Sequence, residues 1–266
     1  MKKLQAETTS DPRLNWVQTS MDKAETIVLI HAVGHDLTYW DQQIEALRHE
    51  YNVVAFDLPG HGRSMGSSEA WSFEYAASVV AKLIEEINTG PVHLVGISFG
   101  GMIAQVTTLA RPDLVLSLSL IGTAARFPDE VRKGMKARAD SVRAAGMSSV
   151  LQSSLERWFT EKTREQRPDI VDRITKTILA DDAPTHAAIW DLISTLDVHA
   201  RLGDIQCRTL VLVGQEDPST PPKVAYELAE AIPNAKVVVI PGASHIVTIE
   251  APAAVNEALR SFLKEL

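Results

Sequence analysis

Cysteine is nearly absent from this 266-residue sequence, and positive charge is in deficit. Cys207 is the only cysteine, so an intrachain disulfide is excluded and nothing indicates an oxidising compartment. Lysine and arginine total 26 against 34 aspartates and glutamates, which gives a net charge of −8. Nucleic acids and anionic membranes bind basic surfaces, so neither is expected as a partner.

Long hydrophobic runs are missing as well. Apolar stretches such as Thr26–Ile30 and Thr209–Val213 are far shorter than the ~20 residues that a membrane-spanning helix needs. Residues 1–16 contain two lysines but no apolar segment behind them, so no secretion signal is expected. Hydrophobic residues still make up 45% of the chain, enough for a buried core. We therefore expect a soluble, cytoplasmic protein, either a monomer or a homodimer.

Short apolar runs alternate with longer stretches of helical periodicity, the pattern typical of βαβ units and a mostly parallel sheet. Several runs are apolar at nearly every position, as expected of strands covered by helices on both faces. Between Trp71 and Asn88, apolar residues three to four apart mark one face of a helix. The candidate strands are Leu14–Thr19, Thr26–Ile30, Asn52–Phe56, Val92–Val95, Leu114–Ile121, Thr209–Val213 and Lys236–Ile240.

The alternation stops between residues 127 and 199, where the sequence contains only helical stretches. We interpret this segment as a helical cap inserted between strands. The predicted core then comprises residues 1–126 and 200–266. The candidate cap helices are Glu130–Ala144, Ser148–Phe159, Asp169–Leu179 and Thr185–Leu196.

A serine within a glycine-rich turn is the strongest functional signal. The apolar run that begins at Val92 leads into Gly96-Ile-Ser98-Phe-Gly100, and a helical run follows. A strand before Gly-x-Ser-x-Gly and a helix after it are what a nucleophile elbow requires. The two glycines leave room where a Cβ would collide with neighbouring backbone. Ser98 is therefore the candidate nucleophile, exposed at the N-terminus of a helix whose amides favour negative charge.

A serine hydroxyl needs a base to accept its proton, and that base needs an acid to orient it. His245 follows the last predicted strand, and Asp217 follows the strand before it. Carboxyl ends of parallel strands are where such sheets place ligands. Glu216 is the alternative acid, but adjacent residues point in different directions, so only one of the two can serve. We favour Asp217.

The negatively charged oxygen of an acyl-transfer intermediate needs two N–H donors. One is expected from the backbone of Phe99, directly after the nucleophile, and the other from Val33, with Ala32 as the alternative. His31 and His35 have the four-residue spacing of a metal pair, but no third ligand is apparent near them. Neither a metal nor another cofactor is expected.

Five motifs in order resemble the α/β-hydrolase superfamily over essentially the whole chain. They are His31-Ala-Val-Gly34, Asp57-Leu-Pro-Gly-His-Gly-Arg-Ser64, Gly96-Ile-Ser-Phe-Gly-Gly101, Gly214-Gln-Glu-Asp217 and Gly242-Ala-Ser-His245. The resemblance implies an α/β-hydrolase fold, the Ser98–Asp217–His245 triad and the oxyanion turn. Within the superfamily the chain is most similar to 3-oxoadipate enol-lactonases, with cues at 36–43, 122–125, 142–160 and 217–222. Its oxyanion turn and elbow depart from the sequences typical of those lactonases.

The expected activity is hydrolysis of a small ester or lactone through an acyl-enzyme. A carboxylesterase, a thioesterase, a carbon–carbon bond hydrolase, a cofactor-free perhydrolase and a non-enzymatic ligand-binding protein remain as alternatives. For a carboxylate-bearing substrate, Arg126 is the candidate partner. Aromatic residues are the candidates for the pocket wall. They are Tyr39, Phe127, Trp158 and Trp190.

Overall fold

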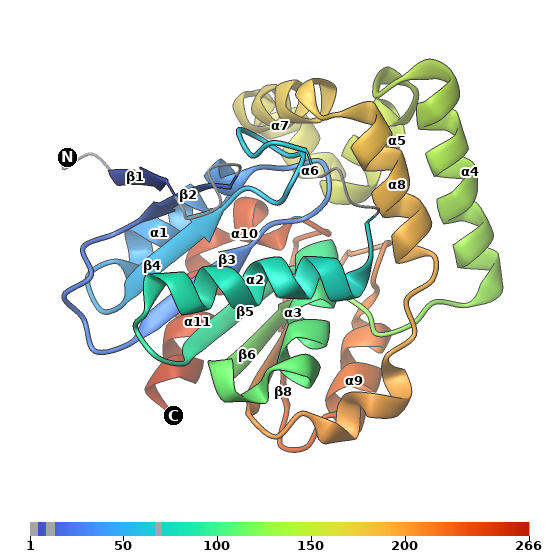
Figure 1. Cartoon of the computed structure of the whole chain (residues 1–266). Coiled ribbons are helices and arrows are strands. Elements are labelled where there is room, and N and C mark those ends of the chain that lie inside the picture. Colours follow the sequence, from blue (N-terminus) through green and yellow to red (C-terminus); the bar gives the residue numbers. More distant parts are fainter. Residues whose placement is uncertain (1–4, 9–13, 67–70, 266) are drawn as a thin grey trace.

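The computed structural model describes residues 5–8, 14–66 and 71–265. Most of residues 1–16, for which the sequence analysis expects no secretion signal, lie outside the described residues. The described strands form one eight-stranded sheet in the order β1-β2-β4-β3-β5-β6-β7-β8 (Figure 1). Strands β1 and β2 are antiparallel to their neighbours, and the others are parallel. The strands are β1 (Gln5–Thr8), β2 (Asn15–Gln18), β3 (Thr26–Ile30), β4 (Asn52–Phe56), β5 (Val92–Ile97), β6 (Val115–Ile121), β7 (Arg208–Gly214) and β8 (Lys236–Ile240).

Two hydrophobic cores cover the two faces of the sheet. In β3, Val28 and Ile30 belong to one core, and Ile27 and Leu29 belong to the other. Side chains alternate across a strand, so a strand buried on both faces is apolar at nearly every position. This is why the central strands are recognisable from sequence as continuous apolar runs.

Helices on each side close these cores (Figure 1). On one side lie α2 (Phe73–Ile87), α3 (Phe99–Ala110) and α9 (Pro222–Ala231). On the other lie α1 (Asp41–Leu47), α10 (Val247–Glu250) and α11 (Pro252–Lys264). The short 3₁₀ helices are η1 (Leu37–Trp40), η2 (Pro112–Leu114) and η3 (His199–Asp204).

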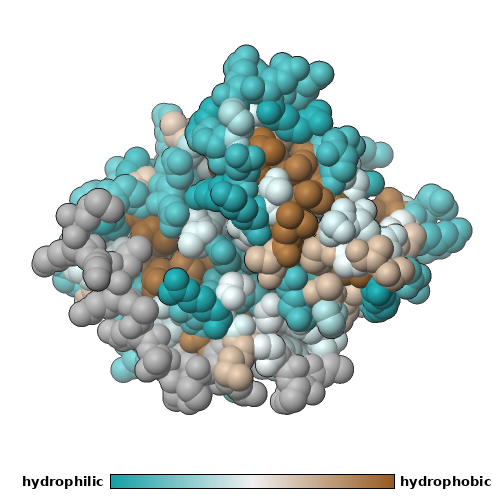
Figure 2. Space-filling model, turned by 90° about the horizontal axis from the view of Figure 1, so that it is seen from above, coloured by the Kyte–Doolittle hydropathy of each residue, from teal (hydrophilic) through white to brown (hydrophobic). Residues whose placement is uncertain are grey.

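Five α-helices lie between β6 and β7, and we call residues 129–193 the helical insertion. They are α4 (Asp129–Ala145), α5 (Ser148–Trp158), α6 (Glu161–Gln166), α7 (Pro168–Ala180) and α8 (Ala183–Ile193). Figure 1 shows them grouped at one end of the sheet. Seen from above, this face is largely hydrophilic, with stretches of hydrophobic residues exposed between hydrophilic ones (Figure 2).

The predicted elements agree with the structure except at their ends and in several omissions. All seven candidate strands are present, although β5 continues to Ile97 and Leu114 belongs to η2. The sequence analysis missed β1 and the helices α1, α6, α9 and α10. These elements are short, so they offer few positions at which an apolar periodicity can be recognised. In the part of the chain that the structure describes, no helix is long and apolar enough to cross a membrane.

Candidate active site

Ser98 occupies a tight turn between β5 and α3. Its backbone has φ 51° and ψ −116°, a positive φ that is rare outside glycine and that costs free energy. A Cβ at Gly96 would lie 2.3 Å from the carbonyl oxygen of Gly100, so only glycine fits there. The Ser98 amide donates to the carbonyl oxygen of Ile121 at 2.9 Å, which fixes the turn against β6. The turn thus holds the Ser98 side chain at the carboxyl end of the sheet.

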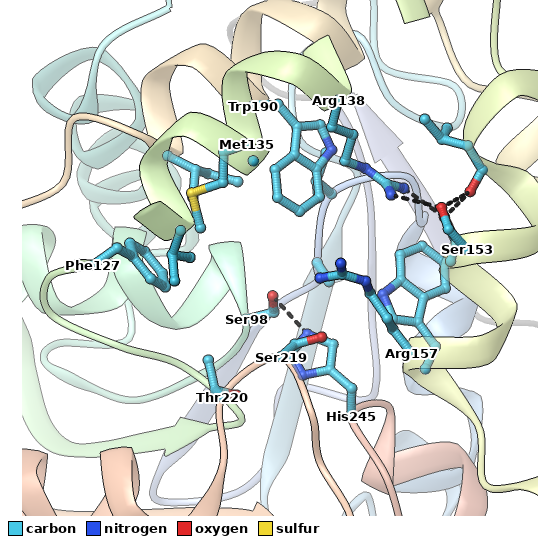
Figure 3. A pocket seen from close by; sticks show the side chains of 18 of the residues that line it. Ser98, Phe127, Met135, Arg138, Ser153, Arg157, Trp190, Ser219, Thr220 and His245 are labelled. Carbon is cyan, nitrogen blue, oxygen red and sulfur yellow. Dashed lines mark hydrogen bonds between the residues drawn. The ribbon is translucent and has the colours of Figure 1, made fainter. Parts of the chain in front are cut away.

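His245 links Ser98 to Asp217. The Nδ1 of His245 lies 2.8 Å from an Asp217 carboxylate oxygen, and its Nε2 lies 3.0 Å from the Ser98 hydroxyl (Figure 3). A carboxylate only accepts, so Nδ1 carries the proton and Nε2 accepts from the serine. The three residues follow β5, β7 and β8, and the parallel register brings those strand ends to one edge.

Asp217 is buried and held by several donors. The amides of Ser219 and Thr220 donate to one of its oxygens, and the Thr220 hydroxyl and His245 donate to the other. Burial favours the neutral acid, but the electrostatic interaction with His245 and these hydrogen bonds outweigh it and keep the pKa of Asp217 below its ordinary value. Glu216, the alternative acid, is exposed to solvent. The carboxylate that faces His245 is therefore ionised at neutral pH.

Backbone amides near the Ser98 hydroxyl are available to bind an anion. Phe99 is the first residue of α3, so its N–H has no acceptor within the helix. Val33 and Ala32 both line the cavity beside Ser98. The neighbouring His31 uses both ring nitrogens on the backbone, at the carbonyl of Ala32 and the amide of Leu58. His31 therefore shapes this turn and has no free nitrogen for a metal.

A cavity of about 490 Å³ lies between Ser98 and the helical insertion. That size suits a small-molecule ligand. One side is apolar, and Phe127 and Met135 point into it (Figure 3). The opposite side carries Arg138 and Arg157 together with serine hydroxyls from α5 (Figure 3). Ser98 lies between the two sides, so the cavity combines an apolar and a cationic region around one nucleophile.

Arg138 reaches the cavity from α4 without a carboxylate partner among the described residues. Its guanidinium contacts the hydroxyls of Ser153 at 3.4 Å and Ser154 at 2.5 Å and lies 4.7 Å from the centre of the Trp190 ring. Its Nε is buried and has no hydrogen-bond partner among those residues. Burial and the nearby Arg157 lower the pKa of Arg138 to about 10, which still leaves it charged at neutral pH. Neither Arg138 nor Arg157 has a carboxylate partner among the described residues, and two such cations facing one cavity favour an anionic ligand.

Three of the four predicted aromatic wall residues line the cavity, namely Phe127, Trp158 and Trp190. Tyr39 does not line it; it is buried, and its hydroxyl accepts from Thr248 at 2.5 Å. Arg126 is exposed and also lies outside the lining, where its backbone forms a single bridge to Asp197.

Sequence reasoning missed the two arginines of the cavity. A signal for Arg138 was present, because it interrupts a buried stripe of α4 formed by Met135, Ala139 and Val142. A charge within an apolar stripe marks either a salt bridge or a polar site. Arg157, the penultimate residue of α5, has no such signal. Its relation to Ser98 depends on how the insertion packs on the core.

Comparison with known proteins supports the fold. A family model described as the alpha/beta hydrolase fold matches residues 25–252. The chain is 27% identical to 3-oxoadipate enol-lactonase 2 of Acinetobacter baylyi, covering 97% of this chain and 95% of that protein. It is 27% identical to the (E)-2-((N-methylformamido)methylene)succinate hydrolase of the same organism, covering 91% of each. A thermophilic esterase from Thermogutta terrifontis, solved with malate bound, has a TM-score of 0.89 at 29% identity and covers 99% of this chain and 98% of that one.

Proposed function

The chain belongs to the α/β-hydrolase fold family, and from that premise we propose that it is a serine hydrolase that cleaves a small carboxylate-bearing ester or lactone through an acyl-enzyme. The observation that carries the proposal is the continuous hydrogen-bonded series from Ser98 through His245 to Asp217. Each atom needed for nucleophilic attack is within hydrogen-bonding distance of the next.

In the proposed reaction His245 accepts the Ser98 proton while the serine oxygen attacks the substrate carbonyl carbon. The negative charge on the carbonyl oxygen is held by the amides of Phe99 and Val33. His245 then gives its proton to the leaving alkoxide, and the carbon–oxygen bond breaks to leave an acyl-enzyme. Asp217 stabilises the imidazolium that exists between these proton transfers. Water, deprotonated by His245, releases the acid and restores Ser98.

The cationic side of the cavity supports a substrate with a carboxylate outside the reacting group. We propose that Arg138, assisted by Arg157, binds this carboxylate. Arg138 replaces Arg126, the candidate from the sequence analysis. Arginine can donate two parallel hydrogen bonds to a carboxylate, and Arg138 has a buried Nε that no described residue accepts from. The relatives' names agree in kind, since an oxoadipate lactone, a succinate derivative and bound malate all carry carboxylates.

The proposal is tested with the purified protein and Ser98→Ala. A fluorophosphonate probe should label the wild type, mass spectrometry should place the adduct on Ser98, and the variant should not react. The mono-p-nitrophenyl ester of glutarate should be hydrolysed by the wild type alone. A wild type that neither reacts with the probe nor hydrolyses the ester would overturn the serine mechanism. A ligand-binding role would then take its place.

A further inference from the structure

Trp190, which stacks on Arg138, is itself held by two buried residues, His186 and Asp181, that take part in no step of the proposed reaction. The indole N–H of Trp190 donates to the Nε2 of His186 at 2.9 Å. The Nδ1 of His186 lies 2.7 Å from a carboxylate oxygen of Asp181. The His186 side chain is fully buried, and that of Asp181 is 3% exposed. A series of contacts therefore runs from Asp181 through His186 and Trp190 to the guanidinium of Arg138.

The chemistry of the donors fixes the direction of this series. An indole nitrogen can only donate, so the Nε2 of His186 must accept. Burial lowers the pKa of His186 despite the opposite effect of Asp181, and a neutral imidazole has one donor and one acceptor. Its Nδ1 consequently carries the proton and donates to Asp181. The Trp190 ring is thereby held in one orientation, with its face toward Arg138.

The series is anchored to the core as well as to the insertion. His186 packs on the turn after β3, where a Cβ at Gly34 would stand 3.3 Å from its ring. Thr185, which directly precedes His186, contacts a second core loop, where a Cβ at Gly60 would stand 2.8 Å from the Thr185 side chain. Asp181 lies 3.9 Å from the Nε2 of His61, which belongs to the same core loop as Gly60. Through these contacts and through Trp190, His186 therefore links the position of Arg138 to that of the turn that contains Val33.

We propose that Asp181 and His186 are positioning residues that act through Trp190 to place Arg138 for the substrate carboxylate, and so set the preference for anionic over neutral substrates. This inference rests on the proposed function. Neither residue lines the cavity, so neither touches the substrate. A ring free to rotate would leave the long Arg138 side chain without its stacking surface and would lower the fraction of molecules ready to bind.

Two esters that differ only at the far end of the acyl chain provide the readout. They are the mono-p-nitrophenyl ester of glutarate, which ends in a carboxylate, and p-nitrophenyl valerate, which ends in a methyl group. Trp190→Phe keeps an aromatic face but removes the N–H that His186 accepts. KM for the glutarate ester should rise about tenfold, a factor that corresponds to roughly one lost hydrogen bond. Trp190 also lines the cavity, so any direct effect of its substitution falls on both esters, and KM for the glutarate ester should rise about tenfold more than KM for the valerate ester.

Three further variants separate positioning from simple loss of structure. In an Arg138→Gln background, Trp190→Phe should add no further loss, because the two substitutions act on one interaction. His186→Gln retains an acceptor for the indole and should keep most of the preference, whereas His186→Leu should lose it. Trp16→Phe is the matched control, since Trp16 is buried in β2, away from the cavity, and its N–H has no partner among the described residues.

Equal losses on both esters, or additive effects of Trp190→Phe and Arg138→Gln, would overturn the proposal. Failure of the serine mechanism looks different, because the wild type would then hydrolyse neither ester. If Trp190→Phe does not fold, the comparison of His186→Gln with His186→Leu carries the test. Loss of the preference in both of those variants, or in neither, would contradict it.

Discussion

Gly100 lies against the carbonyl oxygen of Ile30, so closely that a Cβ on the glycine would stand 2.2 Å from that oxygen. The obstacle is the backbone of the central strand β3, which cannot move without disturbing its pairs with β4 and β5. The turn that carries Ser98 is thus pressed directly onto the sheet.

Gly100→Ala should therefore lower the free energy of unfolding by about 3 kcal/mol, because added volume against rigid backbone cannot be relieved by a rotamer change. Urea unfolding followed by circular dichroism measures the loss. Gly203→Ala is the control, because no atom lies within 4 Å of a Cβ at that position. Equal stability of the two variants would contradict this account of the turn.

Asp217→Asn should reduce kcat on the order of 10⁴-fold, the scale seen when the acid of such a triad loses its charge. An amide cannot stabilise the imidazolium, and it allows the wrong tautomer of His245. Steady-state kinetics with p-nitrophenyl valerate gives the value. Glu216→Gln serves as the comparison, since Glu216 is exposed. If that variant lost as much activity as Asp217→Asn, the assignment of the acid would be wrong.

Arg138→Gln should raise KM for the mono-p-nitrophenyl ester of glutarate roughly 10- to 100-fold, the loss expected for a hydrogen bond between charged groups. KM for the valerate ester should hardly change, because its chain ends in a methyl group. Arg126→Gln removes an equal charge from outside the cavity lining. A similar effect from the Arg126 variant would indicate that net charge, and not a binding contact, sets the preference.

His35 should make the protein less stable in acid. Burial, with smaller electrostatic contributions from His245 and other nearby side chains, lowers the pKa of His35 to about 3. The unfolded chain binds a proton near the ordinary value of 6.5, and the folded protein does not until about pH 3. The unfolded state is therefore favoured progressively as pH falls from 6.5 toward 3, by up to about 1.4 kcal/mol per pH unit.

His35→Phe should remove this slope, since both ring nitrogens lack hydrogen-bond partners among the described residues and the ring packs on Tyr39 and Trp158. The measurement is the urea midpoint at pH 4.5, 5.5 and 7.5. Tyr39→Phe alters the same aromatic cluster and should keep the wild-type dependence. An unchanged slope in His35→Phe would refute the prediction.

The sequence predicted those features that depend on local pattern. Strands covered on both faces are apolar at nearly every position, so β3 and β4 were identified to the residue. Ser98, Asp217 and His245 were proposed as a triad because each lies within a few residues of the carboxyl end of a strand, and in the structure their side chains lie within hydrogen-bonding distance of one another. Arg138 and His186 depend instead on how α4, α5 and α8 pack on one another and on the core. No local periodicity encodes that packing, so Arg126 was a reasonable candidate on position alone.

The helical insertion leaves the core and returns to it at one place. Arg126 and Asp197 form a bridge there, and the amide of Val198 donates to the carbonyl oxygen of Ala125 at 2.9 Å. A segment joined in this way can be lengthened, shortened or exchanged without shifting the register of the strands on either side. Changes in the insertion would therefore alter the residues that line the cavity and leave in place the turn after β5 that carries Ser98.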